Sequence, residues 1–79
     1  MARYYFNVVT PTETIDDPEG AELPSLEQAR GEAIEDARQL MASAMLAGHD
    51  ISTRRIEIIN DLGVLLMVIP FAEAYTRER

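Results

Sequence analysis

The feature that most constrains this chain is a single long amphipathic segment, residues 26–47, with helix signals at both ends. Ser25 stands at the N-cap position and Gln28 follows three residues later, the pattern of a capping box. Gly48 suits the position just past the helix, where the backbone takes a positive φ. Apolar residues recur between these ends with a period near 3.6, which predicts one helix face packed on a core. They are Leu26, Ala29, Ala33, Ala37, Leu40 and Ala44, flanked by Ile34, Met41 and Met45.

The segments on either side of this helix have the composition of β-strands. Residues 3–10 are rich in aromatic and β-branched side chains, which suit a half-buried pleated surface. Residues 12–16 follow as a short return strand. Beyond the helix, residues 54–60 and 64–69 predict a third and a fourth strand, joined by a tight turn over 61–63 in which Gly takes the left-handed position.

The order of these elements predicts the fold class. Residues Asp17 to Gly20 match a type I turn, with Asp first, Pro second and Gly fourth, and separate the first strand pair from the helix. The chain therefore reads β-β-α-β-β: an α+β domain with a four-stranded, mainly antiparallel sheet and one long helix packed on one face. We expect one small domain over residues 1–79, with an ordered core over about 3–71 and a polar tail over 72–79.

The fourth predicted strand is apolar on both faces, since all six residues of 64–69 are apolar. Leu65, Met67 and Ile69 share one face, which leaves Val64, Leu66 and Val68 on the other. One helix covers only one face of a sheet. The other face therefore predicts a second layer, most simply the same face of another copy in a twofold homodimer. The predicted interface residues are Val64, Leu66, Val68, Tyr5 and Val9.

Two alternatives for the uncovered face stay open. The tail could fold back over it as a lid, through Phe71 and Tyr75. The face could also be an open apolar patch that a different protein covers, since large exposed apolar patches mark interaction sites. A clean monomer of 8.9 kDa in sedimentation at micromolar concentration would contradict the dimer.

The net charge of the chain limits the classes of partner that we expect it to bind. Fourteen acidic residues and seven arginines give a net charge of −7. Such a field repels nucleic acid phosphates and anionic membrane surfaces, so we expect neither as a partner. A basic or neutral protein partner is favoured. The chain has no cysteine, no signal-peptide pattern and no long apolar run, which predicts a soluble protein of a reducing cytoplasm.

The residue types that catalysis needs are not gathered in the sequence. His49 is the only histidine and follows the helix end, and no serine has a base placed beside it. Five acids lie close together around the predicted turn, but their spacing does not fit a calcium loop. We therefore predict no catalytic, cofactor-binding or metal-ligating residue and no enzyme activity. The alternative is a metal-dependent hydrolase or isomerase that uses Asp16, Asp17 and Glu19.

Several stretches of the sequence resemble a family of short bacterial proteins of unknown function, a DUF family. The resemblance covers residues 3–71 and implies no activity, because no catalytic residues are assigned to that family. The stretches are the opening Arg3-Tyr4-Tyr5-Phe6, the acidic Asp16-Asp17-Pro18-Glu19-Gly20 turn with Glu22-Leu23-Pro24, the capped helix, and the closing Ile56-Glu57-Ile58, Gly63, Leu65 and Ile69-Pro70-Phe71.

Residues 4–40 also resemble HicB-like antitoxins, in their strand pair, acidic turn and alanine-rich helix. That resemblance implies a binder of a small basic toxin. The chain lacks a DNA-binding segment and the aromatic-Pro-Asp-Leu-Pro-Gly stretch of that family. The leading hypothesis is therefore a non-enzymatic protein-interaction module that forms a homodimer.

Overall fold

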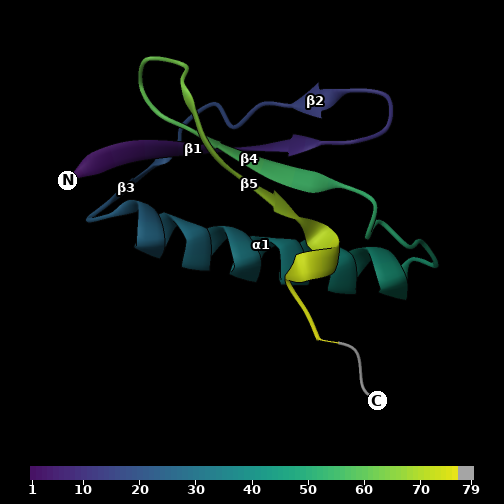
Figure 1. Cartoon of the computed structure of the whole chain (residues 1–79). Coiled ribbons are helices and arrows are strands. Elements are labelled where there is room, and N and C mark those ends of the chain that lie inside the picture. Colours follow the sequence, from purple (N-terminus) through teal and green to yellow (C-terminus); the bar gives the residue numbers. More distant parts are fainter. Residues whose placement is uncertain (77–79) are drawn as a thin grey trace.

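In the computed structural model, which describes residues 1–76, one helix lies across one face of an antiparallel sheet (Figure 1). The α+β class is confirmed, with five strands where four were predicted. The strands run in the order β2-β1-β4-β5, and β3 also pairs with β1. The elements are β1 (Ala2–Val9), β2 (Thr14–Ile15), β3 (Ala21–Leu23), α1 (Leu26–Leu46), β4 (Arg55–Ile59), β5 (Leu65–Pro70) and the short 3-10 helix η1 (Phe71–Glu73).

One edge of the sheet consists of two short strands, β2 and the unpredicted β3. β2 pairs with the end of β1 at Val8 and Val9, and β3 pairs with its beginning. Asp17 occupies the gap between them: its Oδ2 accepts from the backbone N–H of Phe6 at 3.2 Å. The Asp17 carboxylate thus accepts the hydrogen bond that a neighbouring strand would otherwise accept from β1 at this point. Sequence periodicity cannot detect a three-residue strand of this kind, because alternation needs about four residues to show.

The turn before β3 lies at the predicted residues, Asp17 to Gly20. The Asp17 side chain, through Oδ1, accepts from the backbone N–H groups of Glu19 and Gly20. Gly20 has a φ of +67°, and a Cβ there would lie 2.8 Å from the carbonyl oxygen of Tyr4 and 2.9 Å from the Tyr5 ring. Glycine is required at this position for both its backbone conformation and its lack of a side chain.

The helix begins at the predicted residue, Leu26, and ends at Leu46, one residue before the predicted end. The Ser25 side chain accepts from the backbone N–H of Gln28 at 3.2 Å, which is the N-cap bond. At the other end Gly48 has a φ of +88°. The N–H groups of Gly48 and His49 donate to the carbonyls of Met45 and Ala44, the bond pattern of a Schellman motif. Within residues 1–76, no helix is both long and apolar enough to cross a membrane.

The core lies between α1 and the sheet. Small alanines bring the helix close to the strands, and the tail adds an aromatic ring. Leu40 was predicted on this core face but is 42% exposed, because α1 packs mainly on β4, β5, η1 and β3 and leaves the β1–β2 side open. The buried residues are Tyr4, Ala29, Ala33, Ala37, Ile56, Ile58, Ile69, Phe71 and Ala74.

Candidate functional site

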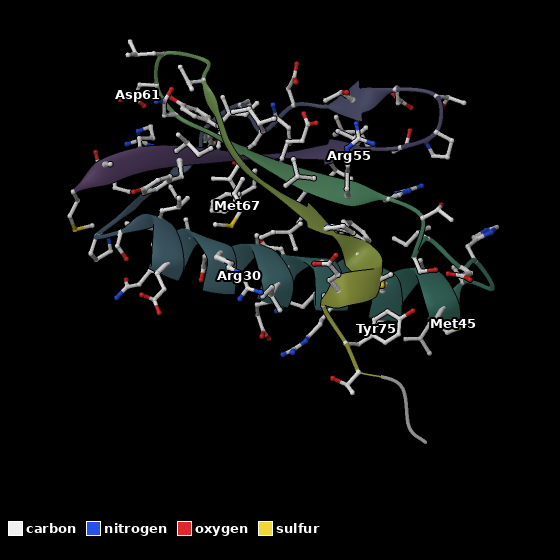
Figure 2. All side chains as sticks on the ribbon, in the orientation of Figure 1. Arg30, Met45, Arg55, Asp61, Met67 and Tyr75 are labelled. Carbon is white, nitrogen blue, oxygen red and sulfur yellow. The ribbon has the colours of Figure 1, made fainter. Side chains whose placement is uncertain are left out.

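The sheet face opposite α1 is the candidate interaction surface. Strand register places Tyr5, Asn7 and Val9 of β1 on this face, opposite Ile59, Glu57 and Arg55 of β4 respectively. Met67 of β5 points the other way, toward α1, while Arg55 points away from the helix (Figure 2). The guanidinium Nε of Arg55 lies 3.5 Å from Oε2 of Glu57. The middle of this open face is therefore polar, and its apolar part lies toward β5.

The predicted interface residues fall into two groups. Val64, Leu66 and Val68 are 50%, 36% and 43% exposed, respectively, in and beside β5. Tyr5 and Val9 are half-buried on β1, and β4 separates them from β5. The Tyr5 ring lies close to Gly20, at the opposite edge of the sheet. The structure therefore does not bring all five residues into one continuous patch.

A register shift in the β4–β5 hairpin exposes residues that the sequence did not indicate. Met67 pairs with Ile58, but Ile59 pairs with Leu65, so Leu66 is an extra residue, a β-bulge. Leu65 was predicted to share the face of Met67 and Ile69. That prediction is wrong: Leu65 lies opposite Ile59 and is 50% exposed. A bulge inverts side-chain alternation, and the uniformly apolar sequence gives no sign of it.

The tail does not cover the open face, so the lid alternative is wrong for the part of the tail that the structure describes. Phe71 is fully buried in the core that α1 shares with the sheet. Ala74 is buried as well, and the Nε of Arg38 donates to its carbonyl at 2.6 Å. Tyr75 lies beside Met45 at the C-terminal half of α1 (Figure 2). Packing on the helix side extends the ordered core beyond residue 71.

The acidic turn has a structural role through one of its members. Asp17 accepts backbone bonds from Phe6, Glu19 and Gly20, whereas the neighbouring Asp16 is exposed. Glu19 is also exposed, and its carbonyl accepts from Arg3. Within residues 1–76, no group of three or more His, Asp or Glu side chains lies close enough together to hold a metal ion.

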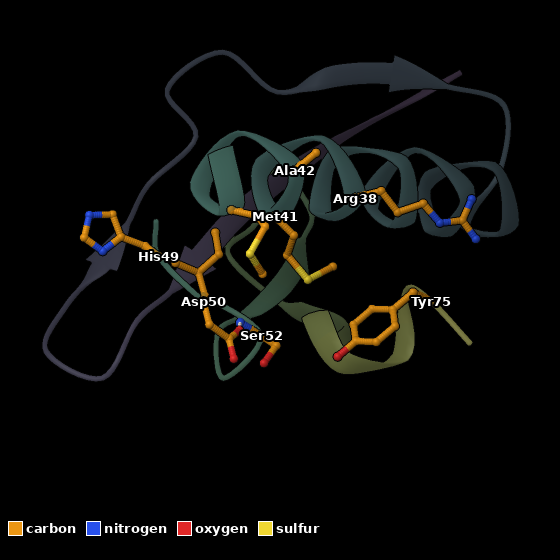
Figure 3. A pocket seen from close by; sticks show the side chains of 9 residues that line it. Arg38, Met41, Ala42, His49, Asp50, Ser52 and Tyr75 are labelled. Atoms are coloured by element: carbon orange, nitrogen blue, oxygen red, sulfur yellow. Dashed lines mark hydrogen bonds between the residues drawn. The ribbon is translucent and has the colours of Figure 1, made fainter. Parts of the chain in front are cut away.

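The only histidine lies beside a shallow pocket of about 380 Å³ between the C-terminal half of α1, the loop that follows it and Tyr75. Figure 3 shows the His49 ring pointing away from Met41 and Tyr75. Asp50 accepts from the backbone N–H of Ser52 at 2.9 Å, and hydrogen bonds from Ser52 lower the pKa of Asp50. This bond closes the loop after the helix, and it gives Asp50 a conformational role.

The chain matches the model of a known family. The model of a domain of unknown function, DUF6894, matches residues 3–72, most of the chain. No curated protein and no solved structure matches. The match extends from β1 to the middle of η1 and includes the split sheet edge, the helix and the β4–β5 hairpin. The chain therefore belongs to the DUF6894 family, whose function is unknown.

Proposed function

We propose that this protein is a non-enzymatic interaction module that forms a homodimer through β5 and the adjoining apolar part of the open sheet face. The observation that carries the proposal is an uncharged strand at a free edge of the sheet. β5 pairs with β4 and with no other strand of the described chain. Long, apolar edge strands are sites at which another chain adds, and natural proteins usually protect them with charges or bulges.

The backbone of β5 offers bonds that a second copy can complete. Phe71 donates its N–H to the carbonyl of Arg54. Counting back along β5 from Phe71, the backbone N–H and C=O groups of successive residues point alternately away from β4 and toward it. Ile69, opposite Ile56, faces β4, and Val68 turns its N–H and C=O outward. Pro70, which has no N–H, also stands at an outward position, where no bond to β4 is lost. Two antiparallel copies of β5 would satisfy the outward groups of each other.

Side chains around β5 favour the same contact. Exposed aliphatic residues are concentrated in one stretch, and burying each half-exposed one contributes about 1 kcal/mol. Residues 62–72 carry no charge, so two copies of this acidic chain meet there without opposing carboxylates. The same surface patch serves both copies, as twofold symmetry requires. The exposed aliphatic residues of this stretch are Leu62, Val64, Leu65, Leu66 and Val68.

Sedimentation velocity at micromolar concentration tests the proposal. We expect a species of twice the 8.9 kDa chain mass. Val68→Lys should give a folded monomer, because it places a charge at the centre of the contact. Thr14→Lys adds the same charge to β2, at the opposite edge, and should stay dimeric. Circular dichroism checks that both variants fold. A wild-type monomer, or a Val68→Lys variant that dimerises as well as wild type, would contradict the proposal.

A further inference from the structure

A groove separates the helix from the β1–β2 arm, on the side of the sheet that α1 covers. Its volume is about 490 Å³, within the range of ligand-binding pockets. It exists because α1 packs mainly on β4, β5, η1 and β3. The groove is separate from β5, which lies at the other edge of the sheet. It is lined by Phe6, Val8, Ile15, Asp16, Asp17, Asp36, Gln39, Leu40, Ser43 and Ile56.

The apolar lining of the groove is only partly covered. Ile15 is 48% exposed on β2 and Leu40 is 42% exposed on α1, so the two face solvent on opposite walls. Phe6 and Val8 are half-buried between them. These side chains retain surface that an apolar group of a ligand would cover, with a gain proportional to the area removed from water.

Among the described residues, 1–76, the charged side chains that line the groove are all acidic. Asp16 and Asp17 lie on the sheet side and Asp36 lies on the helix, and no Arg of this described part lines the groove. Within residues 1–76, none of these three carboxylates forms an ion pair. Burial raises the pKa of Asp36, and the carboxylates of Glu32, Asp17 and Glu35 raise it further. The acidic walls of the groove therefore have a negative electrostatic potential, which a bound cation would reduce.

We propose that this groove binds a basic peptide segment of a partner protein, with large apolar side chains on its floor and Arg or Lys side chains against its acidic walls. Charge complementarity identifies the occupant as cationic. A divalent ion alone does not fit, since the described residues hold no group of three metal ligands. A polyamine has only short methylene segments between its charges, which would cover less of the apolar floor than large apolar side chains do. An amphipathic basic peptide satisfies both features, and this proposal does not depend on the β5 dimer.

Titration followed by NMR tests the proposal on the full-length, isotope-labelled protein. The probe is a capped Arg–Leu peptide, GRLLRRLLRG. Two controls are GRGGRRGGRG, which lacks apolar side chains, and GELLEELLEG, which reverses the charge. We expect the Arg–Leu peptide to shift the amide signals of Ile15, Asp36 and Leu40, and to bind more weakly as salt is raised. Neither control peptide should bind comparably.

Substitutions distinguish peptide binding in the groove from attraction by the overall negative charge of the protein. Asp16→Asn with Asp36→Asn should weaken peptide binding about tenfold, as two partly exposed ion pairs are lost. Glu27→Gln with Glu73→Gln removes the same charge elsewhere and should change the affinity little. Asp17 is left intact because it holds the turn. Ile15→Thr keeps a strand-forming residue but should also weaken binding.

Three results would overturn the proposal. One is equal binding of the Arg–Gly peptide, which would show attraction by net charge alone. Another is equal weakening by both pairs of acid substitutions. The third is a set of shifted signals outside the groove, for instance along β5. A dimer-disrupting Val68→Lys variant should bind the peptide as wild type does, so failure of the dimer and failure of the groove give different results.

Discussion

The two edges of the sheet are built in different ways. At the β2–β3 edge, two short strands flank an acidic loop, and the Asp17 side chain bonds to β1 where a strand is missing. At the β5 edge, one strand of apolar residues, bulged at Leu66, has no charge and no covering segment among residues 1–76. Charges and interrupted strands prevent edge-to-edge association. The comparison indicates that one edge is protected from other chains and the other is available to them.

The largest expected effect concerns Gly20, in the turn before β3 at the β2–β3 edge. Gly20→Ala should lower the free energy of unfolding by about 3 kcal/mol, because strain at positive φ adds to a contact of the new Cβ with the Tyr4 carbonyl. Gly63 also has a positive φ, but a Cβ there meets nothing within 4 Å. Gly63→Ala should therefore cost about 1 kcal/mol. Urea denaturation measures both, and equal losses would show that the close approach is unimportant.

The second prediction concerns the side chain that replaces a strand. Asp17→Ala leaves the N–H groups of Phe6, Glu19 and Gly20 without their acceptor and should cost about 2 kcal/mol. Asp16→Ala removes the same charge from an exposed neighbour and should cost much less. If the two variants have the same stability in urea, the gap between β2 and β3 does not depend on Asp17.

The third prediction concerns the protection of backbone amides along the β5 edge. In hydrogen exchange, the Val68 amide should exchange about tenfold more slowly when the protein concentration is raised into the dimer range, because the partner strand accepts its N–H. The Ile69 amide, which faces β4, should be protected at all concentrations. A Val68 amide whose exchange rate is independent of concentration would exclude edge pairing, even if a dimer forms through side chains.

The smallest expected effect concerns the acidic side of the groove. Burial, and then Glu32, Asp17 and Glu35, raise the pKa of Asp36 above 3.8. A carboxyl whose pKa rises on folding opposes folding when ionised, and this penalty disappears as the pH falls through the folded-state pKa. Asp36→Asn should slightly stabilise the protein at neutral pH, with no gain below the unfolded-state pKa. The effect is small because the side chain is largely solvated.

Thermal unfolding at several pH values measures this difference. Glu27→Gln is the matched control, since Glu27 is exposed in the first helical turn, where a negative charge is favourable. It should be neutral or slightly destabilising at neutral pH. A gain from Asp36→Asn that persists undiminished in acid would contradict the electrostatic explanation.

Local signals in the sequence were sufficient for most of the secondary structure. The Ser25 cap, the glycine at residue 48 and the 3.6-residue period identified α1 to within one residue. Alternation and turn residues identified four of the five strands. Each of these signals acts between residues near one another in the chain, which is why the sequence alone was enough. The proposed dimer and the absence of enzyme activity stay predictions.

The sequence by itself determined the α+β class, the helix with its caps, the two hairpins and an apolar last strand. The tertiary structure alone decided where β3 pairs, that a bulge exposes Leu65, and that Phe71 and Ala74 pack on the helix side of the sheet. It alone also formed the groove beside Leu40. These features depend on contacts between residues far apart in the chain, and a pattern of neighbouring residue types does not record how such segments meet.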